Sequence, residues 1–201
     1  MIRFFPKVFV LVFCAALTAA GLTLCTSSDP ICKLQSWLAL GRYSAHDALI
    51  SAAAKKRGLD PLLVKAMVWR ESAFDPTKIG TSGERGLMQV GEAAAQDWAK
   101  AEKIETFVKT DLFDAKTNLD VGTWYLKRSL DRWKAKENPL PFALAEYNAG
   151  HTRVVRWIEA TGRGDAATAD ELLRAMDFPT TRKYIDDITA RQRFYQAGEG
   201  N

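Results

Sequence analysis

A single glutamate, Glu71, interrupts an otherwise apolar stretch, "DPLLVKAMVWRESAF", at positions 60–74. Asp60 followed by Pro61 is typical of a helix start, because aspartate caps the first turn and proline fits the first helical position. On such a helix Glu71 lies about 20° around the axis from Val64, on the apolar face. Apolar surroundings raise the pKa of a carboxyl, which could then donate a proton near neutral pH. The glutamate could instead pair with an arginine at the edge of the core, and position alone leaves both hypotheses open.

Other residue types that could do chemistry are sparse. Cys14 falls in an apolar run, while Cys25 and Cys32 could bridge a short loop in an oxidising compartment or be two unrelated thiols. The two histidines, His46 and His151, belong to no cluster with metal-ligand spacing. The sequence therefore predicts no metal site, no cofactor and no Ser-His-Asp mechanism.

Length and composition indicate one globular domain. The chain has 201 residues, 47% of them hydrophobic and 26% charged, which suits a domain of roughly 150 residues plus a tail. The formal net charge is +4, to which Arg3 and Lys7 both contribute. The remainder lacks the Lys/Arg stripe interleaved with aromatic residues that favours nucleic-acid binding, so no nucleic-acid partner is expected.

Residues 1–25 have the composition of an export segment. Arg3 and Lys7 form a basic start, and residues 8–24 carry no charge. This pattern fits a signal peptide, cleaved near the small residues at 18–20, or a membrane anchor close to the short limit for crossing about 30 Å of hydrocarbon. Leu24 is too large for a lipoprotein signal ending at Cys25. Either form predicts export to the periplasm or cell envelope, and residues 26–45 are expected to be a linker.

The rest of the chain shows helical spacing and no alternating strand pattern. Gly122 lies within the amphipathic stretch "NLDVGTWYLKRSLDRW" and could let another segment approach closely. The predicted architecture is a compact all-α domain, with helices expected at residues 47–57, 61–72, 92–103, 118–133, 139–149, 152–161 and 169–176.

Four segments are unlike ordinary helical sequence: "ESAF" (71–74), "GERGLMQV" (83–90), "AEYNAG" (145–150) and "FPTTRKYI" (178–185). In this order and spacing, and with Asn118, Gly122 and "YL" (125–126) between them, they resemble the catalytic domain of the soluble-type lytic transglycosylases of family 1. The resemblance covers roughly residues 46–190. It places a catalytic domain at residues 46–197, after the export segment and the linker.

The resemblance implies a lysozyme-like helical fold, a groove that binds the glycan strand of peptidoglycan, and Glu71 as the single catalytic carboxyl. It implies that the substrate-binding residues are Ser72, Met88, Gln89, Tyr147, Asn148 and Tyr184. Tyr147 and Tyr184 would lie close to Glu71, and Tyr147 is expected to be the more important of the two. Met88 could instead belong to the core, Tyr147 could pack a helix end, and Ser72 could only cap or orient.

The sequence departs from the family pattern beside the expected groove. Gly80 stands where many members have serine, and Gly83-Glu84 stands where they have Gly-Ala. Val90 and Gly91 replace an apolar residue, Met and Pro after Gln89. The charges of Glu84 and Arg85 could tune substrate preference or pair with each other in solvent.

A single carboxyl can suffice because the N-acetyl group of the substrate can take the second role. The resemblance implies that Glu71 protonates the glycosidic oxygen and then deprotonates the C6 hydroxyl, which gives a 1,6-anhydro sugar. A goose-type lysozyme or chitosanase would need another carboxylate, for which Asp114 and Asp120 are candidates. A non-catalytic module of an envelope-spanning machine would only grip peptidoglycan. A membrane contact through the N-terminal segment is a further expected interaction.

Overall fold

The computed structural model describes residues 18 and 41–198. In this part of the chain every regular element is a helix, and the only bridges are the isolated pairs Ile79 with Arg85 and Arg85 with Val90. The predicted all-α architecture is therefore confirmed. The helices are α3 (Asp47–Lys56), α4 (Pro61–Ser72), α5 (Glu92–Ala101), η1 (Lys109–Phe113), α6 (Ala115–Arg132), α7 (Leu140–Ala149), α8 (His151–Ala160), η2 (Gly164–Ala166), α9 (Ala169–Ala175) and α10 (Pro179–Gln196).

The export segment, most of the linker and the Cys25–Cys32 pair lie outside the described residues. Within the described part, no helix is both long enough and apolar enough to cross a membrane.

Helix α4 begins and ends as local chemistry dictates. The carboxylate of Asp60 accepts a hydrogen bond from the backbone N–H of Leu62 at 2.9 Å, so the predicted cap is present. The helix ends where Ala73 and Phe74 adopt left-handed backbone angles, with φ of 51° and 63°. This turn directs the chain away from the helix directly after Glu71.

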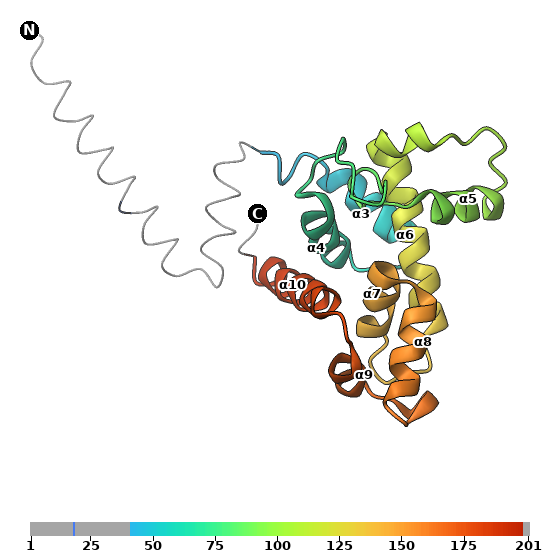
Figure 1. Cartoon of the computed structure of the whole chain (residues 1–201). Coiled ribbons are helices and arrows are strands. Elements are labelled where there is room, and N and C mark those ends of the chain that lie inside the picture. Colours follow the sequence, from blue (N-terminus) through green and yellow to red (C-terminus); the bar gives the residue numbers. More distant parts are fainter. Residues whose placement is uncertain (1–17, 19–40, 199–201) are drawn as a thin grey trace, which may run out of the picture.

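Packing around α4 sets the frame of the molecule. Helix α10 packs along α4, and α7 packs against both α6 and α10 (Figure 1). The apolar face of α4 is fully buried in a core that also takes side chains from α6, α7 and α10; from α4 it includes Val64, Met67 and Val68. Glu71 therefore lies at the edge of the buried core.

The segment between α4 and α5 folds back on itself and rests on α6. Asn118 of α6 holds it, since its amide oxygen accepts from Met88 N at 2.8 Å and its amide nitrogen donates to the carbonyls of Arg85 (2.7 Å) and Leu112 (2.8 Å). At Gly122, one turn further, an added Cβ would lie 2.5 Å from the Met88 sulfur. Gly122 thus permits a close approach, and the group that approaches is the Met88 side chain.

Candidate active site

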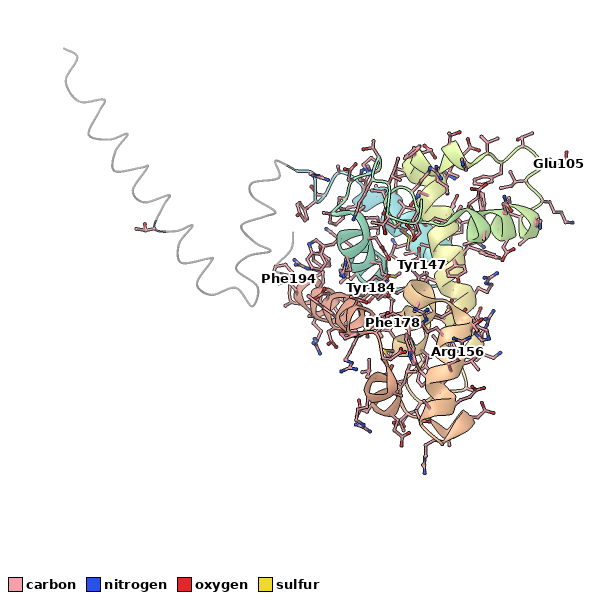
Figure 2. All side chains as sticks on the ribbon, in the orientation of Figure 1. Glu105, Tyr147, Arg156, Phe178, Tyr184 and Phe194 are labelled. Atoms are coloured by element: carbon pink, nitrogen blue, oxygen red, sulfur yellow. The ribbon has the colours of Figure 1, made fainter. Side chains whose placement is uncertain are left out.

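Glu71 opens onto a hollow of about 370 Å³ at the end of α4. Helices α4 and α7 and the segment before α5 supply its walls, and the lining residues are Arg70, Glu71, Lys78, Ile79, Gly80, Thr81, Glu84, Gln89, Tyr147 and Asn148. Figure 2 shows Tyr147 and Tyr184 close together, where α10 packs against both α4 and α7. Segments far apart in the sequence therefore meet around one carboxyl.

The surroundings of Glu71 hold its proton at near-neutral pH. Burial raises the pKa of this carboxyl from the ordinary 4.5 to about 7, against opposing effects from the Tyr184 hydrogen bond and from the charges of Arg70 and Lys78. The negative charge of Glu84 adds to the rise. A carboxyl with a pKa of about 7 can both donate and accept a proton near neutral pH.

Tyr184 of α10 is the tyrosine that contacts the acid. Its hydroxyl donates to Glu71 Oε1 at 2.6 Å, and its ring is almost fully buried. Burial, and then the negative charge of Glu71, raise the pKa of Tyr184 well above its usual range. The phenol therefore stays protonated and remains a hydrogen-bond donor to the carboxylate.

Tyr147 lies beside this pair but bonds elsewhere. Its hydroxyl donates to the carbonyl oxygen of Met88 at 3.0 Å, and its ring meets the edge of Tyr125 at a centroid distance of 5.4 Å. Burial raises the pKa of Tyr147 well above its usual range, and the charge of Glu71 adds to this. The hydroxyl that bonds the acid is therefore that of Tyr184, and the Tyr147 hydroxyl bonds the loop instead.

Asn148 and Gln89 both line the hollow. Asn148 Oδ1 accepts from the Thr181 hydroxyl at 2.8 Å, which ties the end of α7 to the start of α10. Gln89 has a left-handed backbone with φ of 46°, and its amide donates to the carbonyls of Lys78 and Gly86, both at 3.0 Å. These bonds fix the amide of Gln89 in the wall of the hollow.

Three of the predicted substrate-binding residues do not line the hollow: Tyr184, which contacts it only through Glu71, and Met88 and Ser72. The Met88 side chain is fully buried against Gly122, as the core alternative for this residue anticipated. Ser72 is also buried, and its hydroxyl donates to the carbonyl of Val68 at 3.2 Å. Both side chains point into the protein, so they can affect a bound glycan only by positioning the residues that line the hollow.

Of the two charged residues predicted beside the groove, Glu84 lines the hollow and Arg85 does not. The Glu84 carboxylate accepts from the backbone N–H of Ser82 at 3.0 Å. Arg85 instead donates to the Gly83 carbonyl at 3.2 Å, with its guanidinium 5.7 Å from the ring centre of Phe113. Glu84 is thus available to a ligand, and the alternative of a Glu84–Arg85 pair is not what the structure shows.

Sequence reasoning missed Arg70 and Lys78 as lining residues. Arg70 bonds Asp187 of α10 at 3.0 Å, and the Lys78 ammonium donates to the backbone carbonyl of Glu71. The position of Arg70, directly before the glutamate, was a usable signal. The position of Lys78 depends on the left-handed turn at the end of α4, which no residue pattern announces.

The acids proposed for a hydrolase lie elsewhere. Asp114 caps α6 by accepting from Thr117 N at 2.8 Å, and Asp120 pairs with Lys116 at 2.8 Å and Lys56 at 3.4 Å. Neither residue lines the hollow. Among the residues that the structure describes, no group of three or more His, Cys, Asp or Glu side chains could hold a metal ion.

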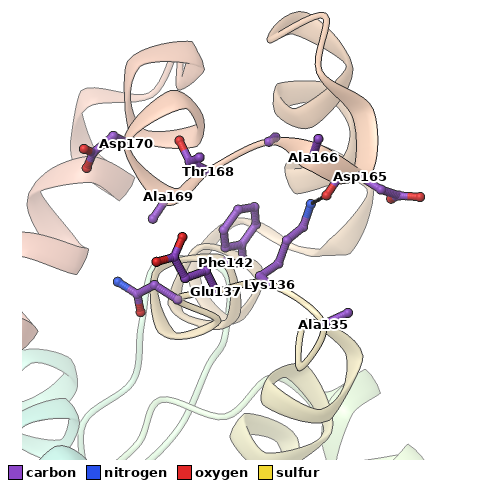
Figure 3. Close-up of a pocket in the computed structure, with 11 residues that line it drawn as sticks. Ala135, Lys136, Glu137, Phe142, Asp165, Ala166, Thr168, Ala169 and Asp170 are labelled. Atoms are coloured by element: carbon purple, nitrogen blue, oxygen red, sulfur yellow. Dashed lines mark hydrogen bonds between the residues drawn. The ribbon is translucent and has the colours of Figure 1, made fainter.

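A separate hollow of about 500 Å³ lies between the α6–α7 connection and the start of α9 (Figure 3). Lys136 crosses it to donate to the carbonyl of Asp165 at 2.6 Å, with its ammonium 5.1 Å from the ring centre of Phe142. None of the predicted site residues lines this hollow. The carboxyl with a near-neutral pKa therefore identifies the smaller hollow as the candidate active site.

Comparison with known proteins places the chain in one family. Residues 48–169 match the family model described as the transglycosylase SLT domain. The chain is 32% identical over 146 residues to membrane-bound lytic murein transglycosylase F of Desulfosudis oleivorans, covering 70% of this chain and 30% of that protein. It is 31% identical over 133 residues to the soluble lytic murein transglycosylase of Escherichia coli, covering 65% of this chain and 20% of that protein.

Solved structures show the same fold. An inactive mutant of lytic transglycosylase Slt from Pseudomonas aeruginosa aligns with a TM-score of 0.67 and 25% identity, over 78% of this chain and 25% of that one. The chain spans only 20–30% of the length of the curated relatives named above. The family model nevertheless covers more than half of the chain, and the chain belongs to the transglycosylase SLT domain family.

Proposed function

We propose that the protein is a peptidoglycan lytic transglycosylase. It cleaves the β-1,4 bond between N-acetylmuramic acid and N-acetylglucosamine and forms 1,6-anhydro-N-acetylmuramic acid. The observation that carries this proposal is the half-buried carboxyl of Glu71, with a pKa of about 7, in an open hollow and hydrogen-bonded to a neutral tyrosine. Such a group can serve one step as an acid and the next as a base.

The proposed reaction uses Glu71 twice. The protonated carboxyl donates to the glycosidic oxygen as the bond to the leaving sugar breaks, and the 2-acetamido group of the muramic acid stabilises the cationic centre. The resulting carboxylate accepts the proton of the C6 hydroxyl on the same sugar, whose oxygen closes the anhydro ring. The hydroxyl reacts within its own molecule, so it has the high effective concentration of an intramolecular step. The Tyr184 hydrogen bond stabilises the carboxylate between the two steps.

The other site residues have supporting roles in the proposal. Gln89, Tyr147 and Asn148, which line the hollow, would contact the glycan strand. Ser72 and Met88 are buried behind the residues that line the hollow, and they would position those residues without touching the glycan. Met88 does so through the carbonyl that accepts the Tyr147 hydrogen bond. No cofactor takes part in this scheme.

The experiment that tests the proposal is Glu71→Gln, which keeps the shape of the side chain but cannot transfer a proton. Digestion of peptidoglycan followed by mass analysis should show anhydro-muropeptides with the wild type and a loss of at least about 100-fold in the variant. Glu92→Gln is the matched control, because Glu92 makes only a surface pair with Lys109 at 3.8 Å. Reducing ends in place of anhydro products would indicate a hydrolase, and glycan binding without release would indicate a non-catalytic module.

The same variant distinguishes a catalytic carboxyl from a structural one. The folded protein holds the Glu71 proton up to a pKa of about 7, whereas the unfolded chain releases it near 4.5. Below pH 4.5 the carboxyl is protonated in both states, so its burial does not reduce the free energy of unfolding. As the pH rises from 4.5 to about 7, the unfolded chain releases the proton first, and the free energy of unfolding falls. At pH 8, Glu71→Gln should increase the free energy of unfolding by up to ~3 kcal/mol. A large fall in melting temperature would show instead that Glu71 pairs with a buried cation.

We also propose that residues 1–25 direct export, as a cleaved signal or an anchor, and that residues 46–197 form the catalytic domain in the periplasm or cell envelope. The basic start and the uncharged run support this. Peptidoglycan strands are the proposed partner, with the membrane or an envelope-spanning machine as further ones. Fusing residues 1–30 to a reporter active only outside the cytoplasm should give signal, and a silent but intact fusion would contradict export.

A further inference from the structure

A second hollow of about 260 Å³ adjoins the first, and it differs in character. The two share Glu84, Gln89 and Tyr147, so they are neighbouring parts of one groove. The second is lined by Glu84, Gln89, Val90, Gly91, Ala93, Ala94, Tyr125 and Tyr147. Among these residues Glu84 alone is charged, and the others offer aromatic, aliphatic and amide surface.

The Glu84 carboxylate is held in the groove by its surroundings. Its Oε2 accepts from Ser82 N, and this oxygen lies only 2.4 Å from where a Cβ on Gly80 would be. The carboxylate thus occupies the space that a side chain at position 80 would take. The two departures from the family pattern, Gly80 and Glu84, are therefore parts of one local arrangement.

The positive charges nearby are engaged elsewhere. Arg85 stacks on Phe113, Arg70 bonds Asp187, and the Lys78 ammonium donates to the carbonyl of Glu71. Arg128 bonds Asp97 at 3.0 Å, lies 4.8 Å from the ring centre of Tyr125, and does not line the hollow. A ligand in the second hollow therefore meets a carboxylate beside tyrosine and alanine surface.

We propose that Glu84 is a specificity-determining residue that makes this end of the groove prefer an amino sugar with a free, protonated amino group over its N-acetylated form. The inference rests on the proposed function and names its substrate class: glycan strands that carry N-deacetylated glucosamine. A neutral sugar over Glu84 removes water from a carboxylate and returns no charge. An ammonium group compensates the carboxylate and also favours the tyrosine face, while the sugar ring packs on the apolar wall.

This preference is compatible with the reaction. Glu71 lines only the first hollow, so the sugar whose acetamido group assists the chemistry lies there. The sugar that faces Tyr125 and Glu84 lies further along the strand and needs no acetyl group. A free amine at this position therefore leaves the acetamido group of the reacting sugar, which the mechanism requires, intact.

The test is calorimetric binding of glucosamine hexamer and N-acetylglucosamine hexamer to the full chain carrying Glu71→Gln. This background prevents turnover and removes the other carboxyl that the hollows contain, so a charge preference must come from Glu84. Near pH 6, where amino sugars are largely protonated, the glucosamine hexamer should bind about tenfold more tightly. Adding Glu84→Gln should bring the two affinities together, whereas adding Glu92→Gln should leave the ratio unchanged.

A second variant displaces the Glu84 carboxylate without changing residue 84 itself. Gly80→Ser places a side chain where Oε2 now lies, so the flexible end of Glu84 must move and the preference should shrink. Equal affinities in the Glu71→Gln background, binding of neither hexamer, or a ratio that survives Glu84→Gln would overturn the inference. Release of anhydro products by the wild type is measured separately. Its absence would contradict the proposed function, whereas its presence without a charge preference would contradict only the role of Glu84.

Discussion

A hydrogen bond of 2.6 Å between Tyr184 and Glu71 is the contact from which the behaviour of the acid can be predicted most directly. Tyr184→Phe removes one positioned donor beside the reacting group and keeps the ring that fills the core. Turnover of peptidoglycan should fall by about 10- to 1,000-fold. Tyr43→Phe is the matched control, because Tyr43 packs on Phe74 and lines neither hollow of the groove. Equal rates for the two variants would remove Tyr184 from the mechanism.

The pH profile gives a second test at this scale. Glu71 must be protonated to begin the reaction, so kcat/KM should decline as the pH rises through about 7, the pKa of the free enzyme's acid. The Tyr184 hydrogen bond lowers that pKa. In Tyr184→Phe the declining limb should therefore move to higher pH, and a limb that stays in place or moves lower would contradict the assignment.

Spacing predicted the environment of Glu71 but not its partner. The helical period placed the glutamate on the apolar face, and that part needed only neighbours within two turns of one helix. Tyr184 is 113 residues away, and its direction depends on how α10 packs along α4. Met88 and Ser72 were in the right segments, but both side chains are buried in the protein and do not line the groove. The helical period alone separates Ser72 from Glu71 by about 100°, whereas the direction of Met88 depends on its contacts with α6.

Helix α6 acts as the support for the loop that forms one wall of the groove. Gly122→Ala would bring a Cβ within 2.5 Å of the Met88 sulfur and 2.8 Å of its Cβ, so the loop must shift. The gain in helix propensity is smaller than this strain, and we expect a loss of about 1–3 kcal/mol in unfolding free energy with reduced activity.

The matched control for this variant is Gly91→Ala, at the start of α5. An added Cβ there meets nothing within 4 Å, and the backbone φ of −77° suits alanine. Chemical denaturation of both variants should show a change below about 1 kcal/mol for Gly91→Ala. Similar losses in the two proteins would mean that the approach of Met88 to α6 does not limit packing.

Most of the helices were predictable because their periodicity and caps are local, but α10 and the short helices η1 and η2 were not among those expected. Their ends differ by up to three residues: α3 stops at Lys56 and α5 at Ala101, before the expected 57 and 103, and α6 begins at Ala115, before the expected 118. The fold of residues 79–90 was not predictable to the same degree. Its shape depends on the side chain of Asn118, nearly thirty positions beyond the loop, and on a left-handed Gln89. The motif named these residues, but only tertiary contacts place them.

At the scale of the whole molecule, the buried core runs from Ile50 to Tyr195. We therefore predict that a chain beginning at residue 41 folds with a melting temperature within a few degrees of the full protein, since it keeps every residue of this core. It should release the same anhydro products from isolated peptidoglycan. Circular dichroism and product analysis check both, and an unfolded 41–201 chain would show that the domain extends further toward the N-terminus.

The bond that joins Tyr184 to Glu71 also has a consequence for the order of folding. Contacts between residues 113 positions apart form only after a long loop has closed, and such contacts limit folding rates. Helices α3 to α9 precede α10 in the chain, so an emerging polypeptide presents its acid before the tyrosine that orients it exists. We therefore expect catalytic activity to appear only after α10 has packed against α4. A half-made chain that ends before α10 would carry Glu71 without this hydrogen bond and without the helix that packs along α4, so we expect it to be far less active than the complete chain.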